Sequence, residues 1–307
     1  MKRFTIYLAA ILAAMSMATA QAKDIIIGVP NWDSVRATAN ILAVAIEENL
    51  GLEVELQTST NPVIFEAMDK GNMHVHPEVW LPNQQNLFDT FVMEKKSVKY
   101  NRNAVLSDQH ICATAGTAQR LGIKSVSDLT DPKIAAALDR DGDGQGDIWI
   151  GTPGWASTKI ERIRAKSYGY DQTLDLKEMD ETLALAQVAN AISANDNIVF
   201  YCYTPHHMFT LYDLVVLKEP AYDAGKWVIK QPTDAPNWLE NSSAPTAWDA
   251  TRLHIHYSAS LERTHPSVAA MLSSVQLNTS QVNGMVYALS VERMDAKEFA
   301  QKWVMEN

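Results

Sequence analysis

Apolar residues in the first third of the chain follow two spacings, one typical of strands and one typical of helices. Short apolar or alternating runs predict strands, and apolar residues at every third or fourth position predict helices between them. Gly51 and Gly71 end these helices. The order strand, helix, strand, helix, strand predicts a mostly parallel sheet that binds ligands beyond the carboxyl ends of its strands. The predicted strands begin at residues 24, 52 and 74, and the predicted helices span 34–50 and 61–70.

The rest of the chain leaves this sheet, forms a second group of elements and then returns. A strand over 105–115 begins the second group, which also holds helices over 131–138 and 180–195 and a strand over 197–203. A chain that leaves one lobe and comes back forms a hinge and a cleft. We therefore predict an α/β protein of two lobes, each a mostly parallel sheet flanked by helices. The predicted bounds are 23–104 and 211–307 for lobe I and 105–210 for lobe II.

The first 22 residues have the features of a secretory signal peptide. Lys2 and Arg3 precede an apolar run over residues 4–15, and small residues follow, so we expect cleavage after Ala20 or Ala22. The run is shorter than the roughly 20 residues of a membrane-spanning helix. No cysteine lies near the cleavage site to carry a lipid. We therefore expect an exported protein in a bacterial periplasm, without membrane insertion after signal removal.

Charge and composition narrow the classes of partner. The formal net charge is −10, and loss of Lys2 and Arg3 makes it more negative by two units. Such a charge disfavours nucleic acid and anionic membranes as partners. Eight tryptophans are a large share for a chain of this length, and although some must belong to the core, they motivate a search for an aromatic site. The two cysteines, Cys112 and Cys202, either form a disulfide or stay buried and inert in an oxidising compartment.

An acidic loop precedes a short predicted strand at residues 148–150. Oxygen-bearing side chains recur at every second residue of the loop, and glycines between them let the backbone fold around a hard cation such as Ca²⁺. Ile150 stands where an EF-hand has its bidentate glutamate, so the loop is not an EF-hand. We expect a structural calcium ion here, and the alternative is a solvated acidic turn. The predicted ligands are Asp139, Asp141, Asp143, Gln145 and Asp147.

Four aromatic residues lie in turns at the ends of predicted strands. Because such ends meet at a cleft, these residues are expected to face each other across it. Several aromatic faces, each with negative potential, bind a quaternary or trimethylated nitrogen that hydrogen-bond donors cannot hold. Any one of the four, taken alone, is more simply explained by core packing. The four residues are Trp32, Trp80, Trp155 and Tyr203.

This arrangement resembles the exported substrate-binding proteins of ABC importers for glycine betaine, proline betaine and related trimethylammonium compounds. The resemblance covers nearly the whole mature chain, and it implies a type II-like periplasmic binding protein, monomeric and not an enzyme, that delivers its ligand to a membrane permease. Tyr203 stands where that family usually has tryptophan. The acidic loop is similar to that of the branch that binds trimethylamine N-oxide (TMAO). The motifs that carry the resemblance are GVPNW at 28–32, HPEVWLP at 76–82, GTPGW at 151–155 and YTPHHMF at 203–209.

Polar groups beside the aromatic residues are candidates for the rest of the ligand. The turn that contains Gly154 leads into a predicted helix, and backbone N–H groups near Ala156 and Ser157 are expected to meet a ligand oxygen. Glu78 and Trp80 share a face of an extended segment. Inside the cleft, the Glu78 carboxylate would favour TMAO or choline over glycine betaine, whose carboxylate it repels. Outside the cleft, it would be solvated or paired.

A metal-dependent periplasmic enzyme is the alternative from another functional class. His74 and His76 have the spacing of a zinc-binding pair, and His254 and His256 repeat it. The two pairs would form a ligand set if the fold brings them together, although Pro77 interrupts the first pair's strand. A receptor returns its ligand unchanged, whereas an enzyme yields a product.

Overall fold

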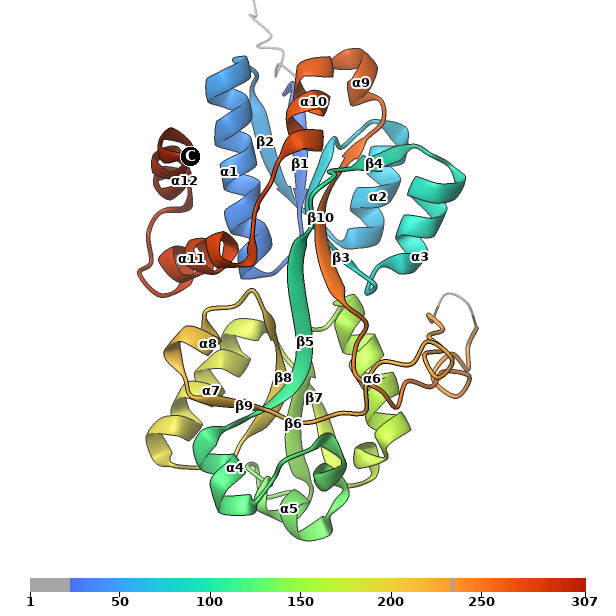
Figure 1. Cartoon of the computed structure of the whole chain (residues 1–307), viewed down its shortest axis with the longest axis vertical. Helices are drawn as coiled ribbons and strands as arrows, with labels where there is room; N and C mark the ends of the chain where they lie inside the picture. The colour runs from blue at the N-terminus through green and yellow to red at the C-terminus, as the bar shows by residue number, and fades with distance from the viewer. Residues whose placement is uncertain (1–22, 233–234) are drawn as a thin grey trace, which may run out of the picture.

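The structure is a computed structural model that describes residues 23–232 and 235–307. The predicted signal peptide, residues 1–22, lies outside the described residues. Among the helices in the described ranges, none is long and apolar enough to span a membrane. The chain forms two halves, one above the other, each with a group of strands and flanking helices (Figure 1). The predicted fold class, an α/β protein of two lobes with flanking helices, is confirmed, and its sheet is mixed: parallel strands in each half are joined by antiparallel ones.

The upper half in Figure 1 is built on three parallel strands from the first third of the chain. Its elements are β1 (Ile25–Val29), α1 (Asp33–Leu50), β2 (Val54–Thr58), α2 (Asn61–Lys70), β3 (Val75–Leu81), α3 (Gln85–Phe88) with a π-helical turn (Asp89–Glu94), β4 (Val98–Tyr100), β10 (Thr251–Ser258), α9 (Leu261–Thr264), α10 (Pro266–Ser274), α11 (Thr279–Ser290) and α12 (Ala296–Glu306). β1 lies between β2 and β3, and β10 pairs with β3 in the antiparallel direction. Gly51 and Gly71 end α1 and α2 with φ angles of 67° and 74°, which favour glycine.

The lower half has a second group of strands with the same mixture of directions. Its elements are β5 (Val105–Thr114), α4 (Ala115–Leu121), a 3₁₀ helix (Val126–Thr130), α5 (Pro132–Ala137), β6 (Gly146–Gly151), α6 (Ala156–Tyr168), a 3₁₀ turn (Tyr170–Gln172), β7 (Leu174–Glu178), α7 (Glu181–Ala194), β8 (Val199–Thr204), α8 (Met208–Leu211) and β9 (Leu214–Val216). β6 lies between β7 and β8 and is parallel to both, whereas β5 is antiparallel to β8.

Two strands, β5 and β10, connect the halves (Figure 1). The first residues of β5 pair with the start of β10, and from Asp108 onward β5 pairs with β8. The sequence led us to expect a return to the first lobe from residue 211. The structure instead pairs β9 with β5, so the chain returns only with β10. A strand pattern does not reveal its neighbour, and the lobe bounds stay a prediction.

A disulfide joins the two central strands of the lower half. Cys112 in β5 and Cys202 in β8 are bonded, with their Cα atoms 5.8 Å apart. Of the two possibilities that the sequence left open, the structure has the disulfide. The bond crosslinks two strands that are far apart in the sequence. Cys202 lies two residues before the end of β8.

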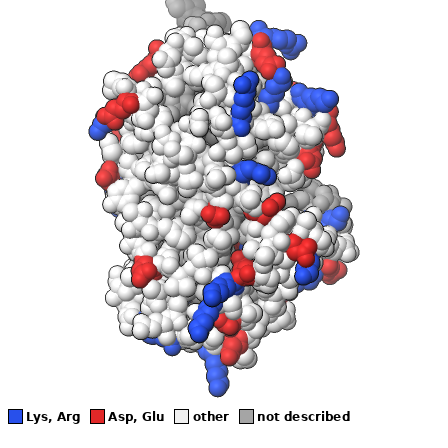
Figure 2. Space-filling model, viewed as in Figure 1, with Lys and Arg blue, Asp and Glu red and all other residues white. Residues whose placement is uncertain are grey.

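Charged side chains on the visible face of the molecule are of both signs. Figure 2 shows basic and acidic groups close to one another, most of them toward one edge of the molecule. A broad area of this face is uncharged. This face therefore carries no large field of a single sign.

Candidate functional site

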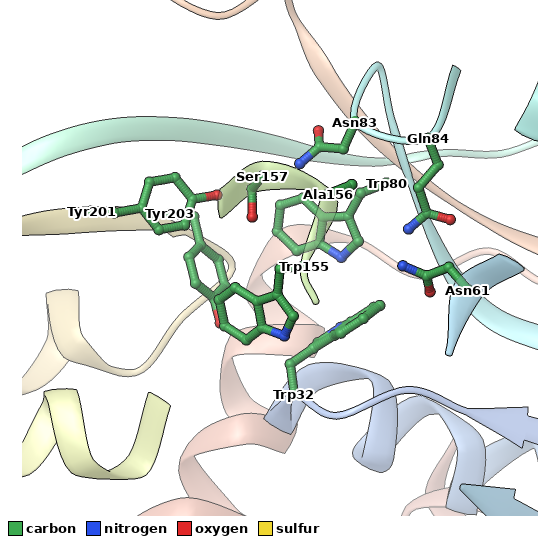
Figure 3. Close-up of a pocket in the computed structure, with 10 residues that line it drawn as sticks. All are labelled: Trp32, Asn61, Trp80, Asn83, Gln84, Trp155, Ala156, Ser157, Tyr201 and Tyr203. Atoms are coloured by element: carbon green, nitrogen blue, oxygen red, sulfur yellow. The ribbon is translucent and has the colours of Figure 1, made fainter. Parts of the chain in front are cut away.

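A small buried cavity lies between the two halves, where strands from both of them end (Figure 3). From the upper half, Trp32 comes immediately before α1 and Trp80 near the end of β3. From the lower half, Trp155 comes immediately before α6 and Tyr203 near the end of β8. The structure thus brings the four predicted aromatic residues to one space. The complete lining is Trp32, Asn61, Trp80, Asn83, Gln84, Trp155, Ala156, Ser157, Tyr201 and Tyr203.

The aromatic rings meet edge to face across the boundary between the halves. The ring centroids of Trp80 and Tyr203 are 5.3 Å apart with an interplanar angle of 89°. Those of Trp32 and Trp155 are 6.3 Å apart at 85°. Within the lower half, Trp155 and Tyr203 are 6.1 Å apart. Rings in such contacts present faces of negative potential to the space that they enclose.

Glu78 accepts hydrogen bonds from the two cavity-lining tryptophans of the upper half. The indole N–H groups of Trp32 and Trp80 each donate to its Oε1 at 2.8 Å, and the hydroxyl of Ser34 donates to the same atom at 2.6 Å. Burial raises the pKa of Glu78 above its usual value, and these hydrogen bonds oppose that shift. Glu78 is therefore neither solvated nor among the residues that line the cavity, and it contacts the rings instead of the enclosed space.

The lower-half rings are held by different partners. The hydroxyl of Tyr203 donates to Oε1 of Glu181, a buried residue that opens α7. The indole N–H of Trp155 donates to the backbone carbonyl of Asn31 at 3.1 Å, and Asn31 belongs to the upper half. The ring of Tyr203 is thus fixed by a partner in its own half, whereas the ring of Trp155 is fixed by a partner across the boundary.

Amide side chains that the sequence analysis missed line the remaining part of the cavity. Asn83 is occupied, because it exchanges two hydrogen bonds with Gln109 at 2.7 and 2.9 Å. Gln84 is 3% exposed, and its Oε1 has no hydrogen-bond partner within the described part of the chain. Asn83 and Gln84 directly follow β3, so the strand-end position that singled out Trp80 also pointed to them.

Asn61 is oriented by a short chain of hydrogen bonds. The backbone N–H of Glu78 donates to Nδ1 of His76 at 3.2 Å, so the imidazole proton is on Nε2, which donates to Oδ1 of Asn61 at 3.0 Å. The amide nitrogen of Asn61 is left for the cavity. In Figure 3 the amide groups of Asn61 and Gln84 point toward the indoles of Trp32 and Trp80.

The predicted turn before α6 contributes only in part. Ala156 and Ser157 line the cavity, whereas Gly154 does not. Gly154 has a φ angle of 91°, which residues with a side chain rarely adopt, so the backbone of the turn requires a glycine at this position. The backbone N–H of Trp155 is already donated to the carbonyl of Thr152 at 3.1 Å. The first N–H groups of α6 remain candidates to meet an anionic oxygen.

The acidic loop gathers three of its five predicted ligands. Carboxylate oxygens of Asp139, Asp141 and Asp147 lie within 4.8 Å of one another. Asp143 is not in this group, and its Oδ1 accepts the backbone N–H of Gln145 at 2.8 Å. The Nζ of Lys177 lies 2.8 Å from Asp141 and 3.1 Å from Asp147, and these carboxylates raise the pKa of Lys177.

The histidines that motivated the enzyme alternative are close together but do not form a ligand set. His76 and His256 are register partners on adjacent antiparallel strands. Burial lowers the pKa of His76 well below its usual value and that of His256 to about 3. In the described ranges, no group of three potential metal ligands includes His74, His76, His254 or His256. These histidines therefore give the metal-dependent enzyme no support in the part of the chain that the structure describes.

Comparison with known proteins gives a family match over nearly the whole described chain. Residues 23–306 match the substrate-binding domain of ABC-type glycine betaine transport systems. A trimethylamine N-oxide-binding protein of Pelagibacter ubique is 23% identical over 304 residues, which cover 96% of this chain and 91% of that protein. A glycine betaine/proline betaine-binding periplasmic protein of Salmonella typhimurium is 21% identical over 195 residues, 61% of this chain and 57% of that protein.

A solved structure supports the same conclusion for the fold. An ABC-transporter choline-binding protein in complex with choline matches with a TM-score of 0.71 at 21% identity, covering 92% of this chain and 88% of that chain. These similar proteins are named as solute-binding proteins. The chain belongs to the family of substrate-binding domains of ABC-type glycine betaine transport systems.

Proposed function

We propose that the protein is an exported periplasmic receptor of an ABC importer, which binds a small trimethylammonium compound and delivers it as a monomer to a membrane permease. The observation that carries this proposal is that one cavity is lined by Trp32, Trp80, Trp155 and Tyr203 together. Such an aromatic enclosure attracts a methylated cation through its ring faces. The names of the similar proteins, which include betaine, choline and TMAO as ligands, support the same class of compound.

Within this class we propose TMAO first, followed by glycine betaine, proline betaine or choline. The residues that line the cavity include no lysine or arginine to neutralise a ligand carboxylate, and Asn61 and Gln84 offer neutral amide groups to an oxygen. TMAO has about five heavy atoms, so its binding free energy is limited to roughly −7.5 kcal/mol, which corresponds to micromolar affinity. Three or four cation-π contacts of up to about 2 kcal/mol account for most of it.

Tryptophan fluorescence titration with TMAO, choline, glycine betaine and proline betaine tests the proposal. We expect saturable binding of at least one of them, and we expect Trp80→Ala and Trp155→Ala each to abolish it without unfolding the protein. Trp303→Ala in α12, far from the cavity, is the matched control and should leave binding unchanged. Wild-type affinity in the first two variants would remove these residues from the site.

We also propose that the loop of Asp139, Asp141 and Asp147 holds a structural calcium ion. The three carboxylates are close enough to share one cation, and the ammonium group of Lys177 already lies 2.8 Å from Asp141 and 3.1 Å from Oδ1 of Asp147, which shows that a positive charge fits there. Gly142 and Gly144, with φ angles of 80° and 92°, allow the tight turn. When bound, the ion would fix the loop that leads into β6, and it would take no part in ligand recognition.

Thermal unfolding with calcium and with a chelator tests the ion. Calcium should raise the melting temperature, because an ion that binds only the folded state stabilises it. Asp141→Asn should reduce this shift, and magnesium should give a smaller one. An identical melting temperature in calcium and in chelator would show that the loop is a solvated acidic turn.

A further inference from the structure

Two buried carboxylates lie behind the rings of the cavity, one in each half. Glu78 in β3 is 3% exposed and Glu181 at the start of α7 is 6% exposed, and neither lines the cavity itself. Across the described chain, neither forms an ion pair with a lysine or an arginine. A buried charge without a basic partner is costly, so its other interactions must explain how it is held.

Glu78 receives three donors on one oxygen. The indole N–H groups of Trp32 and Trp80 and the hydroxyl of Ser34 all donate to Oε1, at 2.6 to 2.8 Å. Hydrogen bonds to a carboxylate favour its ionised form. These three donors offset part of the cost of burying the carboxylate, and they place its Oε1 at the N–H edges of two indoles that border the cavity. An indole that donates its proton to an anion is polarised, which makes its face more attractive to a cation.

Glu181 supports the opposite wall in a similar way. The hydroxyl of Tyr203 donates to its Oε1, and Nε2 of His206 lies 3.3 Å from the same atom. The backbone N–H of Met208 donates to Nδ1 of His206 at 3.0 Å, so Nε2 is the ring nitrogen that faces Glu181. Glu181 is thus held by the hydroxyl of Tyr203, and the imidazole of His206 is the nearest basic group to it.

We propose that Glu78 and Glu181 are positioning residues, which fix the aromatic rings of both walls and give the cavity a negative potential through them. The inference rests on the proposed function and deepens it, because it narrows the class of ligand. A trimethylammonium group in the cavity would lie one ring away from each carboxylate and would be attracted to both.

The same two charges disfavour a ligand that carries a carboxylate of its own. Such a group would be repelled by both glutamates, and the cavity lining offers it only neutral amides and hydroxyls, from residues such as Asn61, Gln84 and Ser157. The preferred ligand is therefore a methylated ammonium compound whose polar end is a hydroxyl or an N-oxide oxygen.

Isothermal titration with choline and with 3,3-dimethylbutan-1-ol tests the inference. The alcohol has the shape of choline, but a neutral carbon replaces the charged nitrogen. Glu78→Gln and Glu181→Gln keep the size and an acceptor oxygen of each side chain and remove the charge. We expect each variant to bind choline about tenfold more weakly, and the double variant about 100-fold, with the affinity for the alcohol changed less than about twofold. Glu66→Gln removes the same charge from an exposed position in α2, so it should leave the affinity for both ligands unchanged.

An equal loss of affinity for choline and for the alcohol would overturn the inference, because a purely structural role weakens both ligands. Unchanged choline affinity in Glu78→Gln and Glu181→Gln would overturn it as well. If Glu78→Gln does not fold, Glu181→Gln and Tyr203→Phe carry the test, since the latter keeps the ring and removes the hydroxyl that reaches Glu181. A wild-type protein that binds no methylammonium compound at all would instead refute the proposed function, together with the inference.

Discussion

The two walls of the cavity are built differently. In the upper half, Trp32 and Trp80 are both tied to Glu78, and every one of these hydrogen bonds lies within that half. In the lower half, Tyr203 is tied to Glu181, but the indole N–H of Trp155 reaches the carbonyl of Asn31 in the upper half. The upper wall can therefore be complete before the halves meet, whereas the lower wall is completed by their contact.

This difference assigns separate tasks to the two walls. A wall that is already organised loses little conformational entropy when a ligand arrives, so it contributes mainly to affinity. A ring whose partner lies on the other half connects ligand binding to closure of the cleft. We therefore expect changes in the upper wall to alter affinity alone, and changes at Trp155 to alter affinity and closure together.

Removal of a ring from the upper wall should have the largest effect. We expect Trp80→Ala to weaken ligand binding by at least about 100-fold, because it removes up to about 2 kcal/mol of cation-π attraction and a hydrogen bond to Glu78 worth about 1 kcal/mol. Calorimetry with TMAO or choline measures the loss. A reduction of less than about tenfold would place the upper wall outside the binding site.

Acid should destabilise the upper half through His256, a buried histidine in β10. Burial lowers the pKa of His256 from 6.5 to about 3 in the folded protein. The unfolded chain therefore binds the proton first, and stability is lost as the pH falls below about 6.5, by about 1.4 kcal/mol per pH unit.

The variant His256→Phe isolates this contribution, because a phenyl ring suits the surrounding rings of Phe65, Phe88 and Tyr100 and does not titrate. Urea unfolding at pH 7 and pH 5 should show that the variant loses about 2 kcal/mol less than the wild type over this interval. An equal loss in both proteins would mean that His256 is not held neutral.

A smaller change should separate closure from affinity. Trp155→Phe keeps a ring and removes the N–H that is donated to Asn31, so we expect about a fivefold loss of affinity and a more open ligand-free protein in small-angle scattering. Trp32→Phe is the matched change in the upper wall, where the lost hydrogen bond is internal. It should lower affinity without opening the protein. Identical scattering curves for Trp155→Phe and Trp32→Phe would contradict the proposal that only the lower wall is linked to closure.

The smallest effect on ligand binding is expected from the acidic loop, which belongs to neither wall. Lys177→Met removes the ammonium group that forms ion pairs with Asp141 and Asp147. Calcium should then bind the loop more tightly. Ligand affinity should stay within about twofold of the wild type, as expected for distant sites. A large change in ligand affinity would show that the loop is coupled to the cavity.

Residues at the ends of strands were predictable from the sequence alone. Trp32, Trp80, Trp155 and Tyr203 each follow or end an apolar run, and the fold brings such ends together at one cleft, as expected for parallel sheets. Glu181 was not predictable in this way, because its position at a helix start is explained locally and only the tertiary structure brings it to Tyr203.

The acidic loop shows the opposite limit of a local pattern. Its spacing identified a candidate cation site, and the structure gathers the carboxylates of Asp139, Asp141 and Asp147 there without that of Asp143. Lys177, which contacts the loop from β7, has no place in the pattern. The pairing of β9 with β5 likewise depends on contacts that the strand pattern does not contain.

A crystal structure of the protein with bound TMAO or choline tests the central claim most directly. The methylated nitrogen should lie within about 6 Å of the ring centroids of Trp32, Trp80, Trp155 and Tyr203, with its polar end toward Asn61 and Gln84. A ligand bound elsewhere, with these four rings packed against each other and no space between them, would contradict the claim.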